Sequence, residues 1–292
     1  MQHRYLGALV GLAAFLAMTA DQVAAVQPPY TCDSSGVVCQ VPPGLYSTTV
    51  QNNQTDSRGY TVTNNGTITV TLPAANVPAG NNGTVALSWS LNGTNGTNSN
   101  DKKDAPTAGG NSGGLTFTNA GSITQTGNGG SLTYGIDTIQ VTTQGGNGGN
   151  YTDTDNNQGG ASAGSAGSVT FTNANLVIFN GSFSVPTTSV VLARSVGGTG
   201  GSTTSRGPDS NGNPQYGSQN GTNGGSAGSV TMTNNTSITV GGLSVGTALW
   251  AVQALSQGGN AGNGNDGQSG GSAGAVTSTS GHVGNTLDRE RR

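Results

Sequence analysis

The sequence predicts an all-β fold, specifically a right-handed parallel β-helix (a solenoid) with glycine-rich loops, and three observations support this prediction. The chain of 292 residues contains 52 Gly, 40 Thr, 31 Asn and 30 Ser, so more than half of its side chains are small or polar. Leu, Ile, Val and Phe together number 51, which is too few for a large helical or doubly wound core. Short motifs of alternating polar and apolar residues recur along the chain at a nearly constant spacing.

The low charge of the chain excludes two classes of protein. Only 7% of the residues are charged and the formal net charge is −3, so the self-repulsion typical of disordered chains is missing. The sequence has nine Lys and Arg residues, three of them within the last four positions, and they leave no basic face for nucleic acid. We therefore expect a folded protein that does not bind nucleic acid.

Residues 1–25 are expected to form a secretory signal peptide. His3 and Arg4 give a short basic start, an apolar run follows as far as Ala20, and the sequence Val-Ala-Ala at 23–25 suits cleavage. The apolar run of about 15 residues is shorter than the roughly 20 that a membrane-spanning helix needs. The mature chain is therefore expected to be secreted or displayed at the cell surface.

The only two cysteines, Cys32 and Cys39, lie just after the expected cleavage point, in an N-terminal cap that spans residues 26–59. An exported chain enters an oxidising compartment, where such a pair normally forms a disulfide bond. A zinc site is the alternative, but zinc needs four ligands and the mature chain offers one histidine, His282. We therefore expect a disulfide and no bound metal.

Residues 60–287 contain four repeat units and a truncated fifth, and a charged tail follows at 288–292. The clearest motif is Thr-x-Thr-Asn, whose middle position recurs at spacings of 55, 54 and 61 residues. That position is occupied by Val62, Phe117, Phe171 and Met232. A Gly/Ser stretch precedes each of the last three copies, and a shortened fifth copy begins at Gly270. Such periodicity is typical of solenoid proteins.

Alternation within each motif predicts a strand with one buried face. In the second copy, Phe117 is expected to point inward while Thr116 and Thr118 point outward. Because one unit cannot cover its own apolar face, the copies must stack and share a thin core. The residues expected in this core are Val62, Ile68, Leu115, Phe117, Ile123, Val169, Phe171, Val177, Val230, Met232 and Ile238, with Trp89, Ile136, Ile139, Val191, Trp250 and Val252 from a second apolar cluster in each unit.

A glycine-rich segment follows the second cluster in the last three units. We expect each unit to hold about two rungs, so that four units at roughly 4.8 Å per rung give a rod of about 40 Å. The asparagines that follow each Thr-x-Thr are expected at tight corners, because asparagine tolerates a left-handed backbone. These corner residues are Asn64, Asn119, Asn173 and Asn234.

The motifs resemble the passenger regions of bacterial autotransporters, especially their long glycine-rich class. The matching stretches are residues 114–123, 134–149, 195–201 and 225–238. The resemblance implies an export signal, a surface-displayed β-helix and a C-terminal β-barrel translocator in the outer membrane. Only eleven residues follow Gly281, so we expect this chain to lack the barrel, as a fragment of a longer gene product or as a free secreted form. Association with the outer membrane would then depend on a translocator outside this chain.

Few residues could serve catalysis or metal binding. Glu290 is the only glutamate and His282 the only mature histidine, so acid–base chemistry would rest on aspartates. The glycine runs that begin at Gly145 and Gly258 have Asn where a calcium-binding nonapeptide needs Asp. The segment 153–157 begins like a calcium loop but is not followed by the required glycine and glutamate. We expect no enzymatic activity, no cofactor and no metal.

The expected function is a structural or adhesive rod that contacts surface glycans, cells or extracellular matrix. Ice or mineral binding through outward Thr-x-Thr pairs is an alternative, but it needs such pairs on consecutive rungs, whereas the motif recurs only about every 55 residues. A truncated, non-functional passenger fragment is a third alternative. The uncapped fifth rung at Val276 leaves open strand edges that invite self-association.

Overall fold

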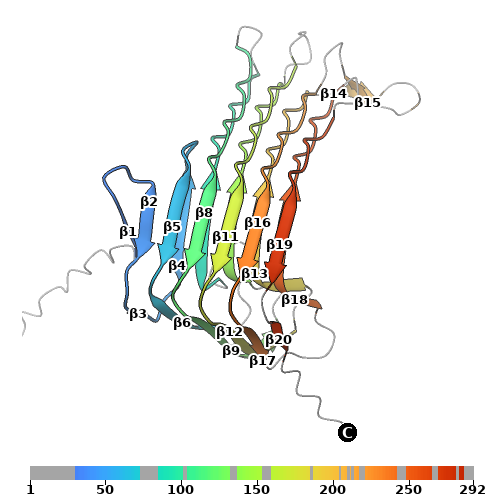
Figure 1. Cartoon of the computed structure of the whole chain (residues 1–292). Helices are drawn as coiled ribbons and strands as arrows, with labels where there is room; N and C mark the ends of the chain where they lie inside the picture. Colours follow the sequence, from blue (N-terminus) through green and yellow to red (C-terminus); the bar gives the residue numbers. More distant parts are fainter. Residues whose placement is uncertain are drawn as a thin grey trace, which may run out of the picture.

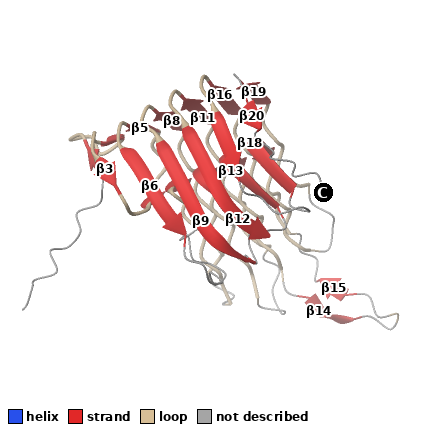
Figure 2. Ribbon diagram, turned by 90° about the horizontal axis from the view of Figure 1, so that it is seen from below, coloured by secondary structure: helices blue, strands red, loops and turns tan. Residues whose placement is uncertain are grey.

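The computed structural model describes residues 30–72, 85–100, 104–131, 137–152, 159–184, 187–203, 205–208, 211, 214–216, 221–241, 248–264, 269–280 and 283–285. These residues contain strands and no helix, which confirms the prediction of an all-β chain. Most strands belong to three sheets, here called A, B and C. Figures 1 and 2 show these sheets on different sides of the molecule, and their inward residues share one core.

Sheet A has seven strands in the order β1-β2-β5-β8-β11-β16-β19, and β2 to β19 are all parallel (Figure 1). Its strands are β1 (Thr31–Cys32), β2 (Val38–Val41), β5 (Tyr60–Asn64), β8 (Leu115–Asn119), β11 (Val169–Asn173), β16 (Val230–Asn234) and β19 (Val276–Ser280).

Sheets B and C contain only parallel neighbours. Sheet B consists of β3 (Leu45–Tyr46), β6 (Thr67–Leu72), β9 (Ile123–Ser131), β12 (Val177–Ser184), β17 (Ile238–Gly241) and β20 (Val283–Asn285). Sheet C consists of β4 (Val50–Thr55), β7 (Leu87–Asn92), β10 (Asp137–Gln144), β13 (Thr187–Val196) and β18 (Ala248–Gln257). A separate antiparallel pair is formed by β14 (Ser205–Pro208) and β15 (Pro214–Tyr216).

Each repeat unit adds one strand to each sheet. The chain passes through sheets A, B and C in that order as β5, β6 and β7, and it repeats the order with β8, β9 and β10. One unit is therefore one rung, and the expectation of about two rungs per unit is wrong. The reason is that the glycine-rich segment takes up much of each unit. Six parallel strands at roughly 4.8 Å span only about 24 Å, well short of the 40 Å expected.

The apolar positions of the Thr-x-Thr motif form one continuous row inside sheet A. Val62 pairs with Phe117, which pairs with Phe171, which pairs with Met232. All four side chains are at most 1% exposed, and the rings of Phe117 and Phe171 stack with their centroids 6.0 Å apart. The predicted shared core of sheet A is thereby confirmed.

Sheets B and C supply the remaining core. Ile68, Ile123, Val177 and Ile238 form a buried row in sheet B. In sheet C, the predicted residues Trp89, Ile139 and Val191 are buried, and Val252 packs half-buried against them. Ile136 and the side chain of Trp250 lie outside the described residues.

The predicted corner asparagines end the strands of sheet A, but they act differently from the expectation. They are buried and form a side-chain ladder, in which the Nδ2 of one residue donates to the Oδ1 of the next at 2.7–2.8 Å. Its members are Asn64, Asn119, Asn173 and Asn234. Gly36 is the one described residue with a positive φ, so the expected left-handed backbone at these asparagines is wrong. At the corner, their side-chain amides form hydrogen bonds from one rung to the next.

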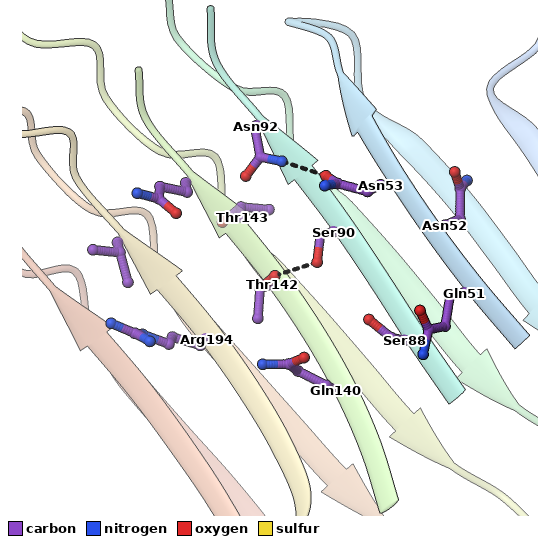
Figure 3. A pocket seen from close by; sticks show the side chains of 12 residues that line it. Gln51, Asn52, Asn53, Ser88, Ser90, Asn92, Gln140, Thr142, Thr143 and Arg194 are labelled. Carbon is purple, nitrogen blue, oxygen red and sulfur yellow. Dashed lines mark hydrogen bonds between the residues drawn. The ribbon is translucent and has the colours of Figure 1, made fainter. Parts of the chain in front are cut away.

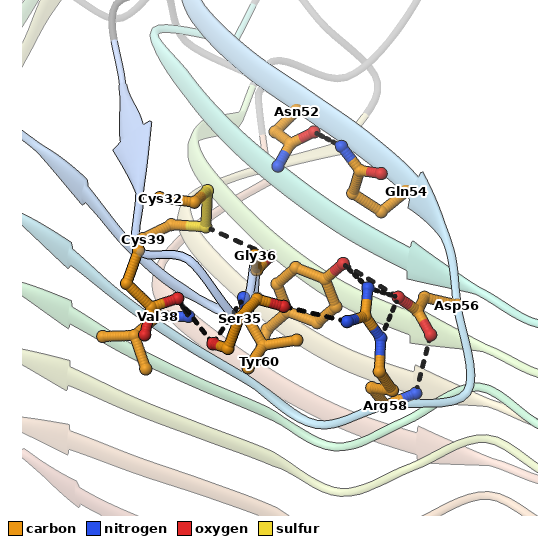
Figure 4. Close-up of a disulfide and its surroundings, with 12 residues drawn as sticks. Cys32, Ser35, Gly36, Val38, Cys39, Asn52, Gln54, Asp56, Arg58 and Tyr60 are labelled. Atoms are coloured by element: carbon orange, nitrogen blue, oxygen red, sulfur yellow. Dashed lines mark hydrogen bonds and ion pairs between the residues drawn. A yellow bond between two sulfur atoms is a disulfide. The ribbon is translucent and has the colours of Figure 1, made fainter.

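The N-terminal end of the core is covered by a disulfide-bonded hairpin (Figure 4). A disulfide joins Cys32 in β1 to Cys39 in β2, and Tyr30 packs edge-on against Trp89 with a centroid distance of 5.0 Å. Arg58 ties this hairpin to the first full rung, because its Nη1 donates to the Ser35 carbonyl at 2.9 Å while its Nη2 forms an ion pair. The carboxylate in that pair is Asp56, which also accepts a hydrogen bond from the Tyr60 hydroxyl at 2.9 Å.

The glycine-rich segments, expected as loops, have a regular backbone that runs away from the sheets (Figure 1). Between the first two outgoing segments, the amides of Gly93, Gly96 and Ser99 donate to neighbouring carbonyls at 2.7–2.9 Å. A hydrogen bond at every third residue is the period of the polyproline II helix, which has three residues per turn and no internal hydrogen bonds. The segments thus form a bundle of extended helices joined mainly by hydrogen bonds between their backbones.

Outgoing and returning segments make two layers that are bonded to each other through glycine. The amide of Gly146 donates to the Gly110 carbonyl at 2.9 Å, and Gly164 donates to Gly146 at 2.8 Å. The same zigzag continues through Gly198 and Gly225 to the later rungs. A Cβ atom added to Gly164 would lie 1.9 Å from the Gly110 carbonyl oxygen, so this interior has no room for side chains.

The register also aligns the outward threonines of sheet A. Thr61 pairs with Thr116, and the row continues through Thr170 and Thr231 to Thr277. Because one unit is one rung, Thr-x-Thr pairs do lie on consecutive rungs. The expectation that they do not, which counted against an ordered threonine surface, is wrong.

Replacement of Asn119 by Ala should lower the free energy of unfolding by about 2–6 kcal/mol. The change strands the Nδ2 of Asn64 and the Oδ1 of Asn173 in the core, and each unpaired buried group costs roughly 1–3 kcal/mol. Urea unfolding measures the effect. The neighbouring change Thr118→Ala, on the outward face, serves as control and should stay within about 0.5 kcal/mol of the wild type. Equal effects of the two changes would contradict a stabilising ladder.

Replacement of Gly164 by Ala should destabilise the protein by about 3 kcal/mol, because the new methyl group forces two hydrogen-bonded backbones apart. The matched change Gly114→Ala places its Cβ 3.4 Å from the nearest atom, so it should be neutral or stabilise the fold by about 0.5 kcal/mol. Thermal unfolding of the two variants measures the difference. Tolerance of alanine at both positions would argue against the packed glycine bundle.

Candidate functional site

A polar groove lies on the outer face of sheet C, across β4, β7, β10 and β13 (Figure 3). The alternation of β7 explains its lining, because Leu87, Trp89 and Leu91 point into the core and leave Ser88 and Ser90 on the other face. The groove has a volume of about 380 Å³. Its walls are therefore built by the same strands that fill the core.

Parallel register brings the outward side chains into rows that cross the strands. One row runs from Asn53 through Ser90 and Thr142 to Arg194. The Thr142 hydroxyl donates to the Ser90 Oγ at 2.9 Å within this row (Figure 3). The row on one side of it contains Ser88 and Gln140, and the row on the other side contains Asn92 and Gln144.

Most groups in these rows are amides and hydroxyls, which both donate and accept hydrogen bonds. The Nδ2 of Asn92 donates to the Oδ1 of Asn53 at 2.5 Å, which holds the two side chains together across neighbouring strands. Such a lining suits a ligand with many hydroxyl groups. None of the described residues that line the groove carries a carboxylate that would act as a general acid or base.

Of the described residues that line the groove, Arg194 alone has a charged side chain. It is half-buried, and its Nε is buried without a hydrogen-bond partner. Among the described residues, the single ion pair joins Arg58 to Asp56, so Arg194 has no salt-bridge partner there. A guanidinium presents a planar set of donors that matches a carboxylate or sulfate, and here that set faces a polar groove.

The groove continues onto the outgoing glycine-rich layer. A second hollow of about 260 Å³ shares Asn92 and Gln144 with the first and extends over Asn95 and Asn147. The Oδ1 of Asn95 accepts a hydrogen bond from the Asn147 amide at 2.9 Å. The Oδ1 of Asn147 accepts another from the Thr199 amide at 2.8 Å, so the amide side chains repeat from rung to rung. Together the two hollows form a polar strip that is longer than either.

Asp137 begins β10 and is the acidic group nearest in sequence to the groove-lining residues of that strand. The Ser189 hydroxyl donates to its Oδ1 at 2.5 Å, and the Ser189 amide donates to the same atom at 3.4 Å. Burial raises the pKa of Asp137 above its ordinary value, while the bonds from Ser189 and the charge of Arg194 oppose this shift in part. The carboxylate is thus partly desolvated and does not neutralise Arg194 through an ion pair.

Several residues weighed from the sequence lie elsewhere. Cys32 and Cys39 form the disulfide in the N-terminal hairpin, whereas His282, Glu290 and the segment 153–157 lie outside the described residues. In the part of the chain that the structure describes, no group of three or more His, Cys, Asp or Glu side chains could bind a metal ion. The same part of the chain has no helix with the length and apolar character needed to cross a membrane.

Sequence reasoning missed the groove and Arg194. The available signal was the second apolar cluster of each unit, where Ser88, Gln140 and Arg194 alternate with core residues. Arg194 is the only basic residue within these clusters. The alignment of the clusters into one face could not be seen until the rung length was known.

Replacement of Asp137 by Asn should raise stability at pH 7. The raised pKa means that the folded state binds the proton more tightly than the unfolded chain, so this stability is present below the ordinary pKa and lost as the pH rises through the raised value. Urea unfolding at pH 7 and at about pH 3 should show a gain at pH 7 that shrinks towards zero at the lower pH.

Asp56 provides a control of opposite sign. Hydrogen bonds from Arg58 lower the pKa of Asp56 well below its ordinary value, so its contribution to stability is present above the ordinary pKa and lost as the pH falls. Asp56→Asn should therefore destabilise the protein at pH 7. A loss of stability at pH 7 in both variants would contradict the assignment for Asp137.

Comparison with known proteins adds no relative: no protein-family model, no curated protein and no solved structure matches this chain.

Proposed function

We propose that the chain is the passenger-type module of a bacterial autotransporter: a right-handed β-helix, secreted or displayed at the cell surface, that adheres to surface glycans of cells or extracellular matrix. The observation that carries this proposal is the polar groove on sheet C with the guanidinium of Arg194, which has no salt-bridge partner among the described residues.

The β-helix assignment is supported by the cyclic order of the three sheets. Each rung passes through A, B and C once, and the next rung repeats the order in parallel register. Connections between parallel strands of one sheet are right-handed in nearly all proteins, which supports the same hand here. The glycine-rich segments leave this helix after sheet C in each rung from β7 onward.

The autotransporter assignment is supported by the sequence resemblance and by the form of the rungs. Stacked rungs let a chain with few apolar residues fold one unit at a time. Cys32 and Cys39 are only seven positions apart, so their disulfide closes a small loop in the N-terminal hairpin. A short disulfide loop suits passage through a narrow pore better than a long one would.

The adhesive function is supported by the chemistry of the groove. Amides and hydroxyls on neighbouring strands recur at roughly 4.8 Å, so a linear chain with regularly placed hydroxyl groups can bond to several rungs. Arg194 favours glycans that carry a carboxylate or a sulfate, because charge-assisted bidentate bonds are stronger than neutral ones. The second hollow over Asn95 and Asn147 lengthens the binding surface.

Replacement of Arg194 by Gln should weaken binding to acidic glycans by roughly 10- to 100-fold, because one hydrogen bond to a charged group is worth about 1.5–3 kcal/mol. The measurement is binding of the purified mature chain to a panel of immobilised polysaccharides with and without uronic acid or sulfate groups. Arg194→Lys should recover part of the affinity, because it keeps the charge but not the planar pair of donors.

Thr124→Gln, on the outer face of sheet B, is the control for a general loss of folding and should bind like the wild type. Absence of glycan binding by the wild type would refute the adhesive function. Equal binding by the wild type and Arg194→Gln would show that the groove is not the glycan-binding site.

A further inference from the structure

The outer face of sheet A carries a regular array of threonines that the proposed adhesive function does not use. Strands β5, β8, β11, β16 and β19 each present two outward threonines, separated by one inward residue. The array comprises Thr61 and Thr63, Thr116 and Thr118, Thr170 and Thr172, Thr231 and Thr233, and Thr277 and Thr279. From this geometry we infer that the face binds the surface of ice.

The register makes this array a two-dimensional lattice. Each threonine pairs with the equivalent threonine of the next strand, without a shift, across all five strands. Neighbouring strands lie about 4.8 Å apart, and residues two apart along a strand lie about 6.7 Å apart. Figure 1 shows these strands side by side with nearly constant direction, so the array is close to flat.

Two features restrict the positions of the threonine side chains: the packed core under the sheet and the limited χ1 freedom of threonine itself. Beneath them, Phe117 and Phe171 stack in the core, and the asparagine ladder through Asn119 fixes the distance between rungs. Threonine is β-branched, so its χ1 angle has few choices on a strand. The hydroxyl and methyl groups therefore repeat with the backbone instead of sampling many positions.

The exposure of the array matches a surface site. Thr61, Thr116 and Thr170 are exposed, and their companions two positions later are half-buried. The hydroxyls of the array form no hydrogen bond with any of the described residues, so they remain available to solvent. The lattice thus offers ten hydroxyl and ten methyl groups to whatever covers it.

The partner must repeat as the lattice does and must be neutral. A protein surface seldom repeats one chemical group, and a linear glycan repeats its groups along one direction only, whereas a crystal surface repeats in both directions of the array. Mineral surfaces are ionic and are matched by charged side chains, but none of the ten positions carries a charge. Ice is a neutral crystal of water whose oxygen atoms repeat at spacings close to both spacings of the array. The hydroxyls can bond to that lattice, and the methyl groups can sit between its water molecules.

The test is the growth of single ice crystals in solutions of the folded mature chain, with the shape of the crystals and the gap between melting and freezing temperatures as readouts. The wild type should produce faceted crystals and a measurable gap. Thr170→Tyr, which places a bulky ring on the central strand of the array, should abolish both. Thr124→Tyr, on the outer face of sheet B, carries the same ring outside the array and should behave like the wild type.

Circular dichroism of each variant verifies that the sheets are retained. Rounded crystals with the wild type would overturn the inference, and so would unchanged faceting with Thr170→Tyr. Arg194→Gln should keep its effect on ice, because the groove belongs to sheet C. Failure of the ice assay therefore leaves the adhesive function untouched, and failure of glycan binding leaves the ice inference untouched.

Discussion

Hydrogen bonding between equivalent backbone positions of successive units is the interaction on which the rest of this structure depends. In sheets A, B and C, every strand from β5 to β17 pairs with the strand one unit earlier and the strand one unit later, and equivalent positions of the repeat face one another. The core is only a few side chains wide, so no single rung can bury enough apolar area alone. Stability comes from repetition, with Val62, Phe117, Phe171 and Met232 as one shared row.

The same constraint is met in two different ways along each unit. In the sheets, inward apolar residues and the asparagine ladder fill the space between rungs. In the glycine-rich bundle, backbones approach so closely that a Cβ on Gly164 or Gly198 would lie about 2 Å from a carbonyl oxygen. There the hydrogen bonds repeat at every third residue, as in a polyproline II helix. A chain with few apolar residues can fold this way because glycine has no side chain, so neighbouring backbones come close enough to be held together by their own hydrogen bonds.

Stacking in exact register also decides what the outer faces present. Any outward residue that recurs in the repeat becomes a row across the sheet, as the threonines do on sheet A. Where the outward residue differs between units, the row contains different side chains. On sheet C, one row combines Ser90, Thr142 and Arg194. A uniform face suits a repeating partner, and a varied face suits a particular glycan. The two proposed activities thus follow from one architecture.

The sequence alone determined the strand class, the inward positions and the stacking, because alternation and repetition are local signals that survive without coordinates. Phe117 and Phe171 were assigned to the core on this basis, and they lie there. The length of a rung was decided only by the tertiary structure, because composition does not reveal that glycine-rich segments leave the sheets and pair with each other. Because one rung is one repeat unit long, the threonines lie on consecutive strands and Arg194 lies beside Thr142. On both surfaces, residues that face one another on neighbouring strands are 37 to 61 positions apart in the sequence, and only the hydrogen-bonded register brings such residues together.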